Sequence, residues 1–230
     1  MELRRTAEHL TGALVQAAVQ EKGEGATRPS FTIALTRETG GRATSVARVL
    51  GARLGWAVYD HEILERIAQE MKVHPRILQR VDERHASLLH EFIESFGSGP
   101  SVSEGAYVRH LGMTLRALGA RGECIIVGRG AAHFLPPQTT LRVRLTAPLE
   151  DRIATMSREL GVPRDQAAQH VEATDRARVR FIKDYFHKDT TDPQNYDLVL
   201  NTSRFSVDEC AELIVEALRR LQARQAAPPA

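Results

Sequence analysis

The 230-residue sequence has few of the features that mark secreted, membrane-spanning or nucleic-acid-binding proteins. Its two cysteines, Cys124 and Cys210, form no ligand-spaced pair, which argues against a disulfide scaffold or zinc site and fits a reducing cytosol. No apolar run reaches the roughly 18 residues that a membrane span needs. Aromatic residues make up only 5% of the chain and do not alternate with basic runs. We therefore expect a cytoplasmic protein without membrane or nucleic-acid partners.

The composition that remains is that of a globular protein. Hydrophobic residues make up 42% of the chain and charged residues 26%, and the net charge is only +2. Residues 3–21 have the pattern of an amphipathic helix rather than a signal peptide. We expect residues 1–29 to form a helical extension with a linker, which either packs back on the body or pairs with a second copy. The folded body spans 30–222, and 223–230 form a flexible tail.

Short β-branched runs alternate with helical patterns along the body. Four runs are typical of buried strands, at 31–36, 124–128, 141–146 and 196–201. A fifth run, "WAVYD" at 56–60, is added to them. Capping boxes at Ser101/Glu104 and Ser206/Glu209 indicate the starts of two of the intervening helices. This alternation predicts an α/β fold with a parallel sheet covered on both faces.

The segment between the first strand and the first helix of the body has the composition of an anion site. Gly40 and Gly41 allow a sharp turn with exposed amides, and the following helix N-terminus adds a partial positive charge. The G-x-x-x-x-G-K-[ST] phosphate-loop pattern does not match, because a second spaced glycine and the lysine are missing. From the loop alone, phosphate binding and a plain structural turn both remain open.

Five motifs in order extend the evidence over most of the chain. They are "ALTRETGGRATSVARVLGARLGWAVYDHEILERIA", "CIIVGRGA", "LRVRLTAPLEDRI", "TDRAR" and "NYDLVLNTSRFSVDECAELI". Together they resemble the cytidylate kinase-like family of P-loop phosphotransferases. The resemblance implies a three-layer P-loop fold with a five-stranded parallel sheet. It also implies a helical monophosphate-binding insertion at about 61–120, a lid at about 160–192, and ATP and Mg²⁺ as cofactors with small nucleotides as partners.

The resemblance assigns roles to the first loop. It places Ala43 where cytidylate kinases have the catalytic lysine and Ser45 where they have the magnesium-binding hydroxyl. Arg42 is the neighbouring candidate to replace the lost charge, and Arg37 is a second one. The predicted phosphate- and ATP-binding residues are Arg37, Thr39, Gly40, Gly41, Arg42, Ala43, Thr44 and Ser45.

Isolated arginines supply the other candidates, because a guanidinium binds phosphate oxygens in pairs. Arg129 lies between two glycines where relatives have "GRD", so it is a substrate ligand and catalytic candidate, or else a structural salt bridge. Asp175 and Arg178 fit the D-x-x-R step of the kinase lid and are catalytic candidates. Arg176 and Arg180 are candidates for closing on the phosphates. The alternative for 173–188 is a solvated helix face.

Asp60 follows the second strand and has two interpretations: a substrate or magnesium-water ligand, and a helix N-cap.

The leading functional hypothesis is an ATP-dependent kinase for a nucleoside monophosphate, with CMP or dCMP first. The alternatives are a catalytically silent nucleotide-binding or interaction protein, and a kinase for another small metabolite. The departures at Ala43 and Gly130 keep these alternatives open.

Overall fold

The computed structural model describes residues 30–60 and 102–226. The chain divides into two compact units, one of Met1–Arg28 with His61–Gly122 and one of Pro29–Asp60 with Glu123–Ala230. In the first unit the structure describes a single helix, α5 (Val102–Arg121). The helix predicted at 3–21, residues 61–100 of the predicted insertion, and the cap residue Ser101 lie outside the described residues. The second unit contains the sheet.

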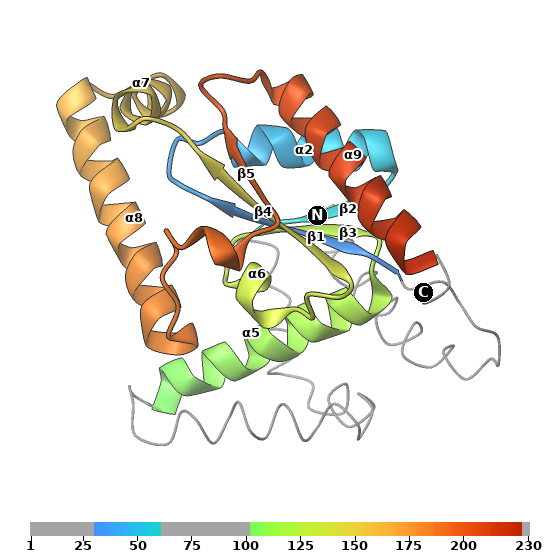
Figure 1. Cartoon of the computed structure of the whole chain (residues 1–230). Helices are drawn as coiled ribbons and strands as arrows, with labels where there is room; N and C mark the ends of the chain where they lie inside the picture. The colour runs from blue at the N-terminus through green and yellow to red at the C-terminus, as the bar shows by residue number, and fades with distance from the viewer. Residues whose placement is uncertain (1–29, 61–101, 227–230) are drawn as a thin grey trace, which may run out of the picture. The chain divides into compact units, whose positions relative to one another are not determined.

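Five parallel strands form this sheet in the order β2-β3-β1-β4-β5 (Figure 1). The strands are β1 (Thr32–Arg37), β2 (Ala57–Tyr59), β3 (Cys124–Val127), β4 (Thr140–Thr146) and β5 (Leu198–Asn201). The predicted five-stranded parallel α/β sheet is therefore confirmed. The last strand begins later than expected, because the Tyr196 hydroxyl donates to the Thr190 carbonyl and Asp197 pairs with Arg142 before β5 begins.

Helices α2 and α9 lie on one face of the sheet and α6 on the other (Figure 1). The helices of this unit are α2 (Ala43–Leu54), α6 (Ala131–Phe134), α7 (Leu149–Leu160), α8 (Arg164–Phe186), the short 3-10 helix η2 (Pro193–Asn195) and α9 (Val207–Ala226). The predicted capping box before α9 is present, since the Ser206 amide donates to Glu209 and the Glu209 amide donates to the Ser206 hydroxyl.

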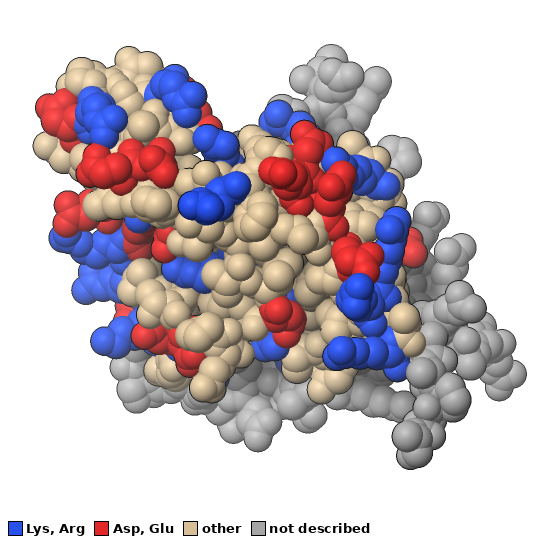
Figure 2. All heavy atoms as spheres, turned by 45° about the horizontal axis from the view of Figure 1, so that its top comes forward, with Lys and Arg blue, Asp and Glu red and all other residues tan. Residues whose placement is uncertain are grey.

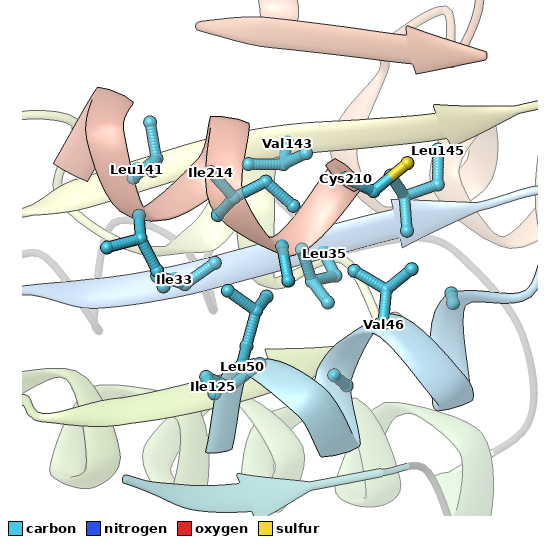
Figure 3. Close-up of a cluster of buried hydrophobic side chains, with 14 of the residues drawn as sticks. Ile33, Leu35, Val46, Leu50, Ile125, Leu141, Val143, Leu145, Cys210 and Ile214 are labelled. Carbon is cyan, nitrogen blue, oxygen red and sulfur yellow. The ribbon is translucent and has the colours of Figure 1, made fainter. Parts of the chain in front are cut away.

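The main core lies between the sheet and the helices α2 and α9 (Figure 3). Alternate residues of the strands point into it, as the two-residue period of a strand requires. Leu141, Val143 and Leu145 do so from β4, while Arg142 and Arg144 occupy the opposite face of the same strand. Each of these arginines has a carboxylate partner, Asp197 for the first and Glu38 for the second. The β4 face opposite the core is therefore polar.

One face of the described residues carries charges of both signs. Figure 2 shows acidic and basic side chains interspersed over the face that it displays. Both cysteines are buried and neither belongs to a disulfide. Within 30–60 and 102–226, no helix combines the length and the apolar character that crossing a bilayer would require.

Candidate functional site

The carboxyl ends of the parallel strands carry the residues that the sequence singled out. Because all five strands run the same way, the segments after β1, β2 and β3 meet at one edge of the sheet. Arg37 ends β1 and pairs in register with Leu145 of β4, while Leu35 pairs with Val127 at the end of β3. Asp60 follows β2, and Arg129 lies two residues after β3. Ligands of open α/β sheets bind at this edge.

The loop after β1 is a tight turn that leads directly into α2. The Gly41 amide donates to the Glu38 carbonyl at 3.0 Å, and Gly40 has a left-handed backbone with φ of 80°. Arg42 is also left-handed, with φ of 54°, and precedes the first helical residue, Ala43. The first amides of a helix have no partners within the helix, so this turn presents donors and a partial positive charge to an anion.

Arg37 lies at the centre of a group of three arginines. Burial lowers the pKa of Arg37 to about 10, helped by the charges of Arg178 and Arg129 and opposed by Asp60. Gly128 makes room for this side chain, because a Cβ there would lie 2.6 Å from an Arg37 Nη atom. The pKa of Arg178 is lowered by burial and by Arg129, against the pull of Asp175. Three guanidinium groups that repel one another form a site suited to an anion.

The helix α8 contacts the first loop through Asp175 and Arg178. One carboxylate oxygen of Asp175 accepts from the Thr39 amide at 2.8 Å and from the Thr39 hydroxyl at 2.6 Å. An Arg178 Nη donates to the same hydroxyl at 2.8 Å. Thr39 is thus bound by two of the predicted site residues of α8, and the loop and helix form one constellation.

The turn that carries Arg129 has an unusual backbone. Gly128, Arg129 and Gly130 have φ values of 83°, 53° and 75°. A Cβ at Gly130 would lie 2.5 Å from ring atoms of Phe186, near the end of α8. A side chain at this position would require the Phe186 ring to shift, on a left-handed backbone that residues other than glycine rarely adopt. The turn is therefore shaped by α8 as well as by its own glycines.

The remaining predicted residues lie elsewhere or at the rim. Arg42 is exposed, and its charge acts on the Cys210 thiol of α9 rather than on Arg37. Ala43 is buried in the main core, Thr44 is exposed and Ser45 is half-buried. Arg176 and Arg180 are exposed and pair along the helix with Glu172 and Asp184. The roles of these residues in binding stay predictions.

Sequence reasoning missed Glu38 of the loop and three residues that bind the loop: Arg144, Thr146 and Arg152. The Glu38 carboxylate accepts from Arg144 at 2.8 Å and from the Thr146 hydroxyl at 2.7 Å. Arg152 contacts Glu38, Thr39 and Asp175. One signal was available in the sequence: an acid such as Glu38, inside a loop predicted to bind anions, must be neutralised by a nearby cation. The partner of Glu38, Arg144, lies 106 positions further along the chain, so no local pattern pointed to it.

Magnesium would need oxygen ligands at this edge. The described residues contain no group of three or more histidine, cysteine or acidic side chains able to hold a metal ion. Mg²⁺ in phosphoryl-transfer sites is held largely by substrate phosphates and waters, with one or two protein oxygens. The half-buried Ser45 in the first turn of α2 is compatible with that arrangement.

The fold is a five-stranded parallel α/β sheet flanked by helices, with the candidate site at the carboxyl ends of its strands. The cytidylate kinase-like family matches residues 32–204, and the chain belongs to this family. The cytidylate kinase of Methanopyrus kandleri is 26% identical over 159 residues, 65% of this chain and 80% of that protein. The cytidylate kinase of Methanocella arvoryzae is 24% identical over 191 residues, 83% of this chain and 98% of that protein.

A solved structure supports the fold independently. The crystal structure of an uncharacterized protein from Eubacterium ventriosum matches with a TM-score of 0.64 at 16% identity. The match covers 83% of this chain and 99% of that chain. At this identity the similarity shows a shared fold alone.

Proposed function

We propose that this protein is an ATP-dependent phosphotransferase that moves the terminal phosphoryl group of ATP to a nucleoside monophosphate. CMP and dCMP are the first candidates as acceptors, because the family relatives above are cytidylate kinases. The observation that carries the proposal is the gathering of Arg37, Arg129 and Arg178 beside the glycine loop.

The chemistry of phosphoryl transfer explains why such a group is useful. The transferring group carries negative charge spread over its oxygens, and the protein accelerates transfer by placing fixed cations around it. In this assignment Arg129 holds the acceptor phosphate, and Arg178 faces the transferring group from the lid helix α8. Arg37 adds a third positive charge beside both, since the charge of each lowers the pKa of Arg37. Asp175 fixes Thr39 of the loop.

ATP and Mg²⁺ would bind at the β1–α2 turn. The first amides of α2 would face the phosphates, and the Ser45 hydroxyl would contribute to Mg²⁺. When bound, the metal would neutralise phosphate charge and order the nucleotide. Asp60 acts electrostatically on Arg37, which supports a role at the acceptor side of the edge.

Two observations support the alternative functions. Ala43, in the lysine position, is buried in the core, which favours a nucleotide-binding protein without transfer activity. Gly130 lies against the Phe186 ring, so an acidic side chain there would require the ring to shift, which favours a kinase for a different small acceptor.

An ADP-release assay separates these functions. ATP and Mg²⁺ are supplied with CMP, dCMP, UMP, AMP or GMP, and wild type is compared with Arg129→Ala and with Arg53→Ala. Arg53, in the last turn of α2, pairs with Asp208 and Glu212 and is the matched control. We expect acceptor-dependent release that falls about a hundredfold or more in Arg129→Ala only. ATP binding without release for any acceptor would favour the silent protein.

A further inference from the structure

Arg152, in the first half of α7, contacts three segments of the edge site. Only 11% of the side chain is exposed. Its Nε donates to the Ala147 carbonyl at 3.0 Å and lies 3.5 Å from a Glu38 oxygen. One Nη donates to Asp175 at 2.6 Å and to the Thr39 carbonyl at 3.2 Å. A single guanidinium therefore joins the segment after β1, the segment after β4, and α8.

The backbone of Arg152 also contacts the loop. A Cβ at Gly40 would lie 2.5 Å from the Arg152 carbonyl oxygen and 2.9 Å from its Cα. Glycine at this position lets the loop lie directly against α7. The loop is consequently held by Arg152 through both its main chain and its side chain.

Arg178 is linked to Arg152 through Asp175 and Thr39, and an Arg178 Nη also lies 3.5 Å from an Asp175 oxygen. Arg152 binds one oxygen of Asp175, and the other oxygen binds the amide and hydroxyl of Thr39. Arg178 donates to that same hydroxyl. Without the Arg152 charge, the half-buried Asp175 carboxylate would lose its closest cation and be stabilised better by water than by the loop.

We propose that Arg152 is a positioning residue: it keeps α8 docked on the β1–α2 loop and thereby presents Arg178 to the phosphate site. It touches no substrate atom in this role. The docking itself is independent of catalysis, whereas the effect on turnover rests on the proposed phosphotransferase function. All contacts that carry the inference lie within the unit that contains the sheet.

The test compares Arg152→Gln and Arg152→Lys with a matched control, Arg164→Gln. Arg164 of α8 pairs with Glu150 of α7, so the control also removes an ion pair between these two helices, but an exposed one. Hydrogen exchange of single amides is followed by NMR without any ligand. We expect the Thr39 amide, which donates to Asp175, to exchange about tenfold faster or more in Arg152→Gln. The amides of Ile33 and Ile125 in the core should be unchanged.

Several outcomes would overturn the proposal. One is unchanged Thr39 exchange in Arg152→Gln, and another is uniform acceleration of all amides, which would indicate a general structural role. A third is equal Thr39 acceleration in Arg164→Gln. If Arg152→Gln does not fold, Arg152→Lys decides, because it keeps the charge without the forked geometry and should accelerate Thr39 exchange by a smaller factor.

Kinetics provide a second readout. For the acceptor identified by the release assay, kcat should fall about tenfold or more in Arg152→Gln, with a much smaller change in the KM for ATP. Equal losses in kcat for Arg152→Gln and Arg164→Gln would contradict the positioning role. Absence of turnover in the wild type would refute the phosphotransferase function and leave the Thr39 result as an independent test of docking.

Discussion

At the scale of single residues, Gly40 and Gly130 stand at positions where neighbouring atoms leave no room for a Cβ. Both have left-handed backbones, a conformation that residues with a Cβ rarely adopt. The Arg152 carbonyl lies over Gly40, and the Phe186 ring lies over Gly130. The sequence predicts that the glycine pair of the loop exposes amides to an anion. The structure adds that its first member allows the loop to approach α7.

Substituting Gly40 tests this packing. Gly40→Ala combines the cost of a left-handed alanine with a backbone clash, so we expect it to lower the free energy of unfolding by about 2 kcal/mol or more. Gly161→Ala is the control, because Gly161 has a similar φ of 66° but no atom within 4 Å of the position that a Cβ would take; it should cost about 1 kcal/mol. Urea denaturation measures both. Equal losses of unfolding free energy in the two variants would show that the Arg152 backbone does not restrict a side chain at position 40.

Among the residues predicted from the sequence, Arg129 was identifiable because an arginine after a buried strand has no packing role that explains it. Asp175 and Arg178 were identified by the D-x-x-R step, and Arg37 as a candidate to replace the missing lysine charge. Glu38 and Arg152 escaped identification because their partners are distant in the sequence and each resembles an ordinary charged residue at a loop or helix end. Side-chain pairing across elements is set by the fold, so local patterns do not reveal it.

At the scale of elements, α8 is attached to the sheet edge at two points. Asp175 binds the loop after β1, and Phe186 packs on the turn after β3. The second point includes His133 of α6, whose ring lies 6.0 Å from the Phe186 ring and 6.1 Å from the Tyr196 ring between centroids. Few aromatic residues occur in the chain, and several of them gather here.

His133 gives this attachment a pH dependence. Burial, with the charges of Lys188 and Arg142, lowers the pKa of His133 from 6.5 to about 4. The neutral form of His133 is therefore favoured in the folded state. Its contribution to the free energy of unfolding is complete above pH 6.5 and is lost as the pH falls toward 4. Allowing for partial exposure, we expect a loss of about 1–2 kcal/mol between about pH 7.5 and 5.

The variant His133→Phe isolates this effect, because it keeps an aromatic ring and removes the titrating group. Urea denaturation at both pH values should show a smaller loss of stability in the variant than in the wild type. An identical pH dependence in the two proteins would mean that His133 does not titrate between the folded and unfolded states as described.

Much of the element content was predictable and some was not. The β-branched runs predicted four of the strands and "WAVYD" the fifth, and the Ser206/Glu209 pair predicted the start of α9. The run 196–201 predicted a strand two residues too long, because Tyr196 and Asp197 make tertiary contacts that the run does not encode. The order of the strands depends on crossover connections, so periodicity within a strand gives no information about it.

At the scale of the whole molecule, the parallel sheet turns scattered sequence positions into one site. Arg37, Arg129 and Arg178 are far apart along the chain, and they interact only because β1 and β3 are neighbours and α8 returns to their edge. The net charge of +2 hides this concentration of positive charge. Holding repelling cations together lowers the stability of the folded protein at the position where an anion would bind.

The most direct test is a calorimetric titration of inorganic pyrophosphate into wild type, Arg37→Met and the control Arg53→Met. We expect binding by the wild type that weakens about tenfold or more in Arg37→Met and is unchanged in Arg53→Met. Because Arg37 is repelled by its neighbours, Arg37→Met should unfold at the same urea concentration as the wild type or a higher one. Equal affinity in all three proteins, or no binding by the wild type, would contradict the assignment of this edge as a phosphate site.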